Sequence, residues 1–441
     1  MNPSVLASNG RRRFRNAVVR GCKLVVAGVA LALVTALMSG TARSAADGEV
    51  LRVGTSGDYP PFSQALDVPS AARTKSAAYE GFDLDVARAF AAAQNLRLEI
   101  IRFAWPSLLD DLAADRFDVA MGGITVRPER SIAGRYSVPV LETSALVLVE
   151  PSNGPINRTA LNKPNVRLVV NAGGHLERVA RRTFDQAEIH ALPDNSAVHM
   201  AFLDRSFDGV VTDSVEAQRW DPKHRYRRIE PLTNDRKAYL MRQDAHGLAA
   251  KLDAFLLSAE ADGTLGLLRK HWFGTNTKNQ PARVEFALLA AIDERLSLMP
   301  HVARFKAANG RAIEDPARET IVLDAAVNAT QRAATINQRP MPNHESVRAL
   351  FAALIEAAKE IQTETAELSS HSSQPTYDLE TALRPALLAI GERLSRLLVQ
   401  LEAPISTARA VDLIDEHIHS YDLSTKARRD LAQALSAISR R

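Results

Sequence analysis

Cysteine is almost absent from this chain of 441 residues, which contains one, Cys22. That residue precedes a short apolar run and does not follow it, which excludes a lipoprotein anchor. The remainder of the chain can form no disulfide and offers no thiol for catalysis. The excess of one sign of charge is also small. The net charge is +4, and several of the positive residues lie in the first segment. A mature chain this close to neutral gives no indication of a nucleic-acid partner.

Long hydrophobic runs are lacking too, and the longest lies near the start. A basic stretch from Arg11 to Lys23 precedes the apolar run Leu24–Met38, and small residues follow it. The run is too short for a comfortable membrane span. Residues 1–46 therefore predict an export signal cleaved near Ala45 and Ala46, a periplasmic location and no membrane contact after cleavage. An uncleaved N-terminal anchor is the alternative.

The length predicts two or three domains, and the pattern of the sequence changes once along the chain. Residues 47–273 alternate strand and helix signals, which is typical of mainly parallel sheets with helices on both faces. Residues 274–281 are polar and rich in turn formers, as expected of a linker. Residues 282–441 show helical periods and no convincing strand, which favours a helical bundle.

In an α/β domain, ligands bind beyond the carboxyl ends of the strands. The loops expected there are 56–62, 122–130, 171–177 and 212–213. Arg130 follows a strand and a Gly-rich turn, and its guanidinium suits a carboxylate because it makes two parallel contacts. Asp213 ends a strand, where it serves either as a partner for a ligand ammonium or as a helix N-cap.

The segment from Glu49 to Phe273 resembles the type-3 periplasmic solute-binding fold, which clamps a small molecule between two lobes. Within that fold it is most similar to the periplasmic cyclohexadienyl dehydratases. The matching stretches are GTSGDYPPF (54–62), GFDLDVA (81–87), WPSLLDDLAADRFDVAMGGITVRPER (105–130), NAGGHLERVAR (171–181), PDN (193–195), TDSVEA (212–217) and KAYL (237–240).

The resemblance implies a site for prephenate or arogenate in which Arg130 holds a carboxylate. It places further substrate-binding residues at Trp105, Gly123, Thr125, Asn171, Asp213 and Lys237. It also implies that Glu177, in the GG-x-x-E stretch, is the catalytic acid, with no metal or cofactor. A glutamate in a closed, partly apolar cleft can have its pKa raised until it is protonated near neutrality. The alternative for Glu177 is a residue that favours the start of a helix.

The stretch from Glu294 to Glu319, ERLSLMPHVARFKAANGRAIEDPARE, reads as helix and carries several cations. Arg295 and Lys306 are eleven residues apart, and Lys306 and Arg318 are twelve apart, which is close to whole numbers of turns. If the helix runs on, these cations converge on one side, next to an apolar stripe. That arrangement predicts an anion pocket inside a bundle, and a solvated charged face is the alternative.

The same stretch resembles the all-helical chorismate mutases, particularly their secreted class, through its ERL, FK and IED patterns and the AAKEIQ segment ending at Gln362. The resemblance implies that Lys306 and Gln362 donate to the ether oxygen of chorismate. It also implies that Arg295, Arg318 and Arg393 clamp the two carboxylates, while Asp315 and Glu319 hold the ring hydroxyl or orient the arginines. Because Gln362 donates at any pH, we expect mutase activity without a requirement for acid. Ala358 stands where the family has a hydroxyl residue, so one contact is lost.

Together the resemblances imply a bifunctional periplasmic enzyme of phenylalanine biosynthesis. Its substrates would be chorismate and then prephenate or arogenate, and the product of one half would feed the other. The alternative is an amino-acid-binding protein fused to a helical interaction module. Neither metal nor cofactor is expected, and a homo-oligomer stays open.

Overall fold

The computed structural model describes residues 49–66, 78–151, 156–229, 231–274, 281–368 and 376–438. The predicted export signal with Cys22, and most of the predicted linker, lie outside these residues. Among the helices described, none is both long and apolar enough to cross a membrane.

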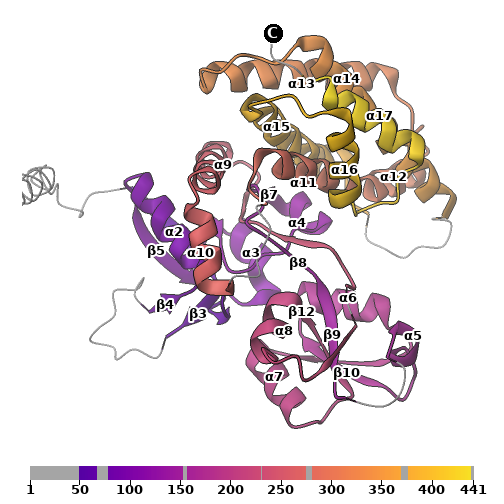
Figure 1. Cartoon of the computed structure of the whole chain (residues 1–441). Helices are drawn as coiled ribbons and strands as arrows, with labels where there is room; N and C mark the ends of the chain where they lie inside the picture. Colours follow the sequence, from indigo (N-terminus) through magenta and orange to yellow (C-terminus); the bar gives the residue numbers. More distant parts are fainter. Residues whose placement is uncertain are drawn as a thin grey trace, which may run out of the picture. The chain divides into compact units, whose positions relative to one another are not determined.

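The first lobe is built on a five-stranded sheet of order β5-β1-β6-β15-β7 (Figure 1). Strand β1 is parallel to β5 and β6, whereas β15 is antiparallel to β6 and β7. A small sheet, β2-β3-β4, lies in the same part of the chain. The strands are β1 (Val50–Thr55), β2 (Asp58–Tyr59), β3 (Ser63–Ala65), β4 (Tyr79–Glu80), β5 (Arg97–Arg102), β6 (Val119–Ala120), β7 (Gly134–Tyr136) and β15 (Leu240–Arg242). The helices of this lobe are α2 (Phe82–Ala93), η2 (Trp105–Ser107), α3 (Leu108–Ala113), α4 (Pro128–Ala133), α9 (His246–Ala261) and α10 (Thr264–Phe273).

The second lobe has a sheet of order β11-β10-β12-β9-β13 with helices on both faces. Alternate residues of a strand point to opposite faces, and here Leu168 and Val170 pack with α6 while Val169 packs with α7 and α8. The strands are β9 (Ala145–Val149), β10 (Arg167–Asn171), β11 (Glu188–Leu192), β12 (Gly209–Asp213) and β13 (Arg227–Ile229). The helices are α5 (Arg158–Leu161), α6 (His175–Thr183), α7 (Asn195–Leu203) and α8 (Ser214–Trp220).

The sheets are less parallel than the sequence predicted. Strand β9 is antiparallel to β12, and β15 is antiparallel to β6, because the chain crosses from one lobe to the other and back. Two strands, β8 (Leu141–Thr143) and β14 (Asp235–Lys237), make those crossings side by side as an antiparallel pair. They form the hinge of the two-lobed domain.

After the linker, the described residues contain helices and no strand, as predicted. The elements are α11 (Val284–Ser297), α12 (Met299–Ala308), α13 (Pro316–Ile336), α14 (His344–Leu368), the π-helical turn η3 (Leu379–Leu383), α15 (Arg384–Gln400), α16 (Thr407–His417) and α17 (Thr425–Ser436). Figure 1 shows them from red-brown to yellow. One buried apolar cluster joins Val138 and Val140 of the first lobe to Leu288 and Ile292 of α11. Each such fully buried side chain contributes about 1.5–3 kcal/mol.

The predicted continuous helix over 294–319 is instead three helices. Helix α11 ends at Ser297, Pro300 lies at the start of α12, and a loop with Gly310 at φ 59° precedes α13. Proline lacks the N–H that a helix interior needs, and the left-handed conformation at Gly310 ends α12. The cations therefore converge through the packing of separate helices rather than along one face.

Candidate active sites

Three of the four loops predicted to meet at the carboxyl ends of the strands, 56–62, 122–130 and 171–177, line a small cavity of about 40 Å³ between the lobes, and loop 212–213 contributes no residue to its lining. Glu177 and Asp213 are the predicted residues of this domain that do not line it. The lining residues are Tyr59, Trp105, Gly123, Thr125, Arg130, Asn171, Gly174, His175, Leu176, Asn195, Glu216 and Lys237.

Lys237 is the centre of a buried polar cluster on one wall of the cavity. Its Nζ lies 3.0 Å from both the hydroxyl of Tyr59 and Oγ1 of Thr125, and 3.4 Å from Oδ2 of Asp213. The other oxygen of Asp213 accepts hydrogen bonds from the backbone N–H groups of Val215 and Glu216, both at 2.9 Å. Asp213 is thus the N-cap of α8, and it is also paired with a cation of the protein.

Arg130 and Asn171 present unpaired donors to the same cavity. Arg130 is 2% exposed, and its Nη1 donates to the carbonyl of Thr125 at 3.1 Å, while Nε has no partner among the described residues. The amide Nδ2 of Asn171 is likewise buried without a partner there. The Arg130 guanidinium also lies 6.0 Å from the centre of the Trp105 ring. Buried donors without acceptors cost free energy, so this wall is suited to an anion.

Gly123 allows the turn that brings these groups together. Its φ is 72°, and a side chain there would collide with the ring of Tyr59. Its N–H donates to Oδ2 of Asp83 at 2.6 Å, and the hydroxyl of Tyr239 donates to Oδ1 at 2.9 Å. Asp83, which lies in the GFDLDVA stretch, therefore fixes the turn from below.

Glu216 is the acid that reaches the cavity. It is 3% exposed, and its Oε2 accepts a hydrogen bond from Oγ1 of Thr212 at 2.7 Å. Burial first, and the neighbouring charge of Asp213 second, raise the pKa of Glu216 to about 8. Both causes favour the protonated carboxyl group, which is the form that can donate a proton to a ligand.

Glu177 lies outside the cavity lining, and the catalytic role that the resemblance implies for it stays a prediction. Its carboxylate accepts hydrogen bonds from the N–H of Gly173 at 2.7 Å and from Nε of Arg181 at 2.9 Å. Burial opposes ionisation, but these two donors outweigh it and hold the pKa of Glu177 below its ordinary value. An ionised carboxylate outside the cavity lining is suited to the start of α6, which was the alternative reading.

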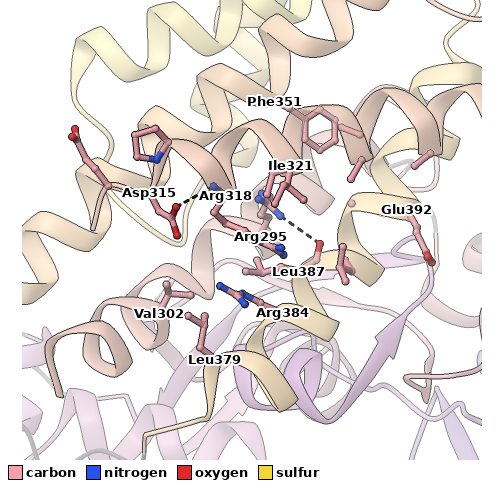
Figure 2. Close-up of a pocket in the computed structure, with 18 of the residues that line it drawn as sticks. Arg295, Val302, Asp315, Arg318, Ile321, Phe351, Leu379, Arg384, Leu387 and Glu392 are labelled. Carbon is pink, nitrogen blue, oxygen red and sulfur yellow. Dashed lines mark hydrogen bonds between the residues drawn. The ribbon is translucent and has the colours of Figure 1, made fainter. Parts of the chain in front are cut away.

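A second and larger cavity, of about 800 Å³, lies in the helical bundle and combines cations with an apolar wall. Of the predicted residues, Arg295, Lys306, Asp315 and Arg318 line it. Figure 2 shows Arg295, Arg318 and Arg384 around one space. The other lining residues are Val302, Arg311, Ala312, Glu314, Pro316, Ile321, Val322, Ala325, Ala326, Ala329, Arg332, Phe351, Leu379, Arg384, Leu387, Leu388, Gly391 and Glu392.

Arg295 and Lys306 are held by carbonyl groups. Arg295 is 8% exposed and its Nη1 donates to the carbonyl of Leu387 at 3.4 Å, as drawn in Figure 2. Burial lowers the pKa of Arg295 to about 10, so it remains a cation at neutral pH. Nζ of Lys306 donates to the carbonyl of Ile313 at 2.7 Å. Asp315 caps α13 by accepting from the N–H of Arg318 at 3.0 Å, which fixes the arginine beside the pocket.

The resemblance implied that Arg393 completes this pocket, but Arg393 is not among the residues that line it. It forms an ion pair with Glu294, and its Nη1 donates to the carbonyl of Tyr136 at 2.7 Å. Arg384, in the same helix α15, lines the pocket in its place. The two arginines are nine positions apart, which is two and a half helical turns, so they project from opposite sides of α15.

Glu319 and Gln362 also lie outside the pocket lining. The carboxylate of Glu319 pairs with Nζ of Lys359 at 3.0 Å and accepts from the N–H of Asp315 at 3.4 Å. Gln362 is buried, and its Nε2 donates to the carbonyl of Ala358 at 3.1 Å. The same Nε2 lies 3.8 Å from Sδ of Met299, so the amide group contacts both α14 and α12.

Sequence reasoning missed Glu216, Arg311 and Arg384. The signal for Glu216 was present in the quoted TDSVEA stretch, one helical turn after Thr212. The signal for Arg384 was a cation at the beginning of a late helix, next to a Pro that favours the first turn.

Two family models match the chain. Residues 51–275 match the bacterial extracellular solute-binding proteins, family 3, and residues 279–363 match chorismate mutase type II. The cyclohexadienyl dehydratase of Pseudomonas aeruginosa is 33% identical over 229 residues, which is 51% of this chain and 82% of that protein. The ABC transporter arginine-binding protein 1 of Escherichia coli is 22% identical over 248 residues, 55% of this chain and 98% of that protein.

Among solved structures, an ancestral amino acid-binding protein described as a precursor of cyclohexadienyl dehydratase is 28% identical, with a TM-score of 0.45. The matched region is 51% of this chain and 95% of the ancestral protein. An ancestral cyclohexadienyl dehydratase is 32% identical, covers 51% of this chain and 93% of its own, and has a TM-score of 0.32.

Proposed function

This chain belongs to family 3 of the bacterial extracellular solute-binding proteins and carries a chorismate mutase type II domain after it, and on that premise we propose that it catalyses two consecutive reactions. The bundle converts chorismate to prephenate. The two-lobed domain then converts prephenate to phenylpyruvate by loss of water and carbon dioxide. A bifunctional enzyme of phenylalanine biosynthesis results, because the product of the first reaction is the substrate of the second.

In the mutase reaction an ether C–O bond breaks and a C–C bond forms within one molecule, and no group passes to the protein. Catalysis then depends on holding the folded substrate and on stabilising negative charge at the ether oxygen. In our proposal Arg295, Arg318 and Arg384 hold the two carboxylates, and Lys306 faces the ether oxygen. The apolar wall around Phe351 and Leu387 receives the ring.

In the second reaction, Glu216 supplies the proton. The proton passes to the oxygen of the ring hydroxyl, the C–O bond breaks and water leaves. The C–C bond to the ring carboxylate breaks as well, carbon dioxide leaves, and the electron pair of that bond completes the aromatic ring. Arg130 and Lys237 bind the carboxylates, and Glu216 recovers a proton from water when the lobes open. We therefore propose Glu216, in place of Glu177, as the general acid.

The same site favours prephenate over arogenate as the natural substrate. Arogenate carries an ammonium group, which would need a free carboxylate as its partner. Asp213 is the acid at the expected position, but its two oxygens are already used by Lys237, Tyr59 and two backbone N–H groups. An incoming ammonium would have to displace the buried Lys237, which costs free energy.

An amino-acid-binding protein fused to an interaction module is the competing function. Amino-acid-binding relatives share the fold of the first domain. The second domain, however, matches an enzyme family and holds a large cationic pocket. Because the first family is extracellular, we also propose that the protein acts in the periplasm after cleavage near Ala45 and Ala46.

The observation that carries this proposal is a buried glutamate, Glu216, whose surroundings raise its pKa and which shares one cavity with Arg130 and Lys237. The test is incubation of the purified protein with chorismate, followed by chromatography of the products. Phenylpyruvate is the expected product. Accumulation of prephenate alone would mean that the first domain binds a ligand and does not catalyse the second reaction. Unchanged chorismate would contradict the mutase function, and prephenate supplied directly would then test the other site.

A further inference from the structure

Helix α11 is enclosed on every side over most of its length. All residues from Ala287 to Leu296 are buried, including the three consecutive charged residues Asp293, Glu294 and Arg295. Successive residues of a helix project about 100° apart, so these three side chains point in different directions. Arg295 points to the mutase pocket, whereas the other two contact the two-lobed domain.

Asp293 forms an ion pair with the hinge between the lobes. Its Oδ2 accepts a hydrogen bond of 2.6 Å from Nη1 of Arg236, and both residues are less than 10% exposed. Its Oδ1 accepts from the N–H groups of His419 and Ser420 at 2.9 and 2.8 Å. Arg236 lies in hinge strand β14 directly before Lys237. Because neighbouring residues of a strand face opposite ways, Arg236 reaches the bundle while Lys237 reaches the cleft.

Glu294 accepts a hydrogen bond from α4, the helix that carries the other cleft cation, Arg130. Its Oε1 accepts a hydrogen bond of 2.9 Å from the hydroxyl of Ser131, which follows Arg130 in α4. Its other oxygen pairs with Arg393, which in turn donates to the carbonyl of Tyr136 in β7. The hydroxyl of Tyr136 donates to the carbonyl of Thr125 at 2.8 Å, the same carbonyl that receives Nη1 of Arg130.

Each cation of the cleft is therefore next in sequence to a residue held by α11. We propose that Asp293 and Glu294 of the mutase domain are positioning residues for the dehydratase site, acting through Lys237 and Arg130 respectively. The proposal rests on the proposed function of that cleft. A displacement of about 1 Å at a substrate-binding group can cost on the order of 100-fold in rate, so a rigid support of this kind affects kcat/KM.

The test compares variants of the full chain with prephenate as the substrate. Asp293→Asn and Glu294→Gln remove the charge and keep the size, and Ser131→Ala removes the contact from the other side without leaving Glu294 unpaired. The matched control is Arg396→Gln. Arg396 pairs with Asp253 at 2.5 Å and so joins α15 to α9, an element that carries no residue lining the cleft.

For Asp293→Asn and Glu294→Gln we expect KM for prephenate to rise about tenfold while kcat changes less than about threefold, because Arg130 and Lys237 bind the ground state and the transition state alike. Ser131→Ala should raise KM by about threefold, as loss of one neutral donor to a charged acceptor predicts. Asp293→Glu, which keeps the charge, should recover part of the loss. Arg396→Gln should lower the melting temperature and leave KM near the wild-type value.

Unchanged KM in all three test variants, with only the melting temperature lowered, would overturn the proposal. An equal rise of KM in Arg396→Gln would also overturn it, because docking of the domains in general would then explain the effect. A wild-type protein that binds prephenate but does not turn it over would contradict the proposed function alone. In that case the dissociation constant for prephenate, followed by tryptophan fluorescence, replaces KM, and the same pattern across the variants is expected.

Discussion

The backbone N–H of Glu216 donates a 2.9 Å hydrogen bond to the carboxylate of Asp213. This contact keeps two carboxyl groups within one turn at the start of α8. Asp213 accepts hydrogen bonds from the N–H groups that it caps, whereas Glu216 is buried beside Asp213, and these surroundings raise the pKa of Glu216. Two acids in one helical turn thereby differ in their contacts: Asp213 caps α8 and pairs with Lys237, whereas Glu216 lines the cavity.

Replacement of Glu216 should stop the second reaction. Glu216→Gln keeps the size and the hydrogen bond with Thr212 but has no proton to donate, so kcat for prephenate should fall by about 10²–10⁴-fold. Glu177→Gln is the matched comparison and should retain kcat within about threefold, since Glu177 lies outside the cavity lining. Initial rates of phenylpyruvate formation measure both. The opposite order of effects would restore Glu177 as the acid.

The rate of the second reaction should depend on pH through Glu216. Its folded-state pKa is raised to about 8, so the required protonated form dominates below that pH and is lost above it. We expect kcat/KM for prephenate to fall about tenfold per pH unit above the pKa. Chorismate consumption by the same protein is the internal control, because no carboxyl group of the mutase pocket needs to be protonated. A fall in prephenate turnover centred near the ordinary glutamate pKa would contradict this assignment.

Discrimination between the two possible substrates should follow from Asp213. Because its oxygens are already paired, arogenate should have a kcat/KM at least about tenfold lower than that of prephenate, the cost of leaving one buried polar group poorly paired. Parallel assays with the two compounds at equal concentrations measure the ratio. A preference for arogenate would mean that Asp213 exchanges Lys237 for the ligand ammonium.

Glu177 and Glu216 also illustrate what the sequence can and cannot predict. Strands, turns and the helical bundle follow from apolar periodicity and turn residues, and Arg130 follows from its place after a strand and a Gly-rich turn, whereas Lys237, inside β14, was indicated by the resemblance alone. Glu177 and Glu216 both lie near the start of a helix that follows a strand, so position alone cannot separate them. Glu177 pairs with Arg181, which is close in sequence. A Glu followed four residues later by an Arg in a helix predicts such an ion pair from the sequence alone. The neighbours of Glu216 in the cavity, such as Tyr59 and Lys237, come from distant segments and require the fold.

In the mutase pocket, too, the sequence indicated one arginine and the structure places another: Arg393 was expected, and Arg384 lines the pocket. Arg384→Ala should lower kcat/KM for chorismate by on the order of 100-fold, because a charge-assisted contact to the substrate is lost. Arg393→Ala should leave the kinetic constants for chorismate within about threefold. It should instead destabilise the protein by about 3–5 kcal/mol, because Glu294 is left as a buried charge without its partner.

Initial rates of chorismate loss, read by ultraviolet absorbance, and melting temperatures distinguish these outcomes. If Arg393→Ala abolished chorismate turnover in a protein that still melts cooperatively, while Arg384→Ala remained active, the sequence-based assignment would be correct. The side of α15 that faces the substrate would then be the one that now contacts Glu294 and the carbonyl of Tyr136. The expected result places the substrate on the opposite side, where Arg384 shares the pocket with Arg295 and Arg318 (Figure 2).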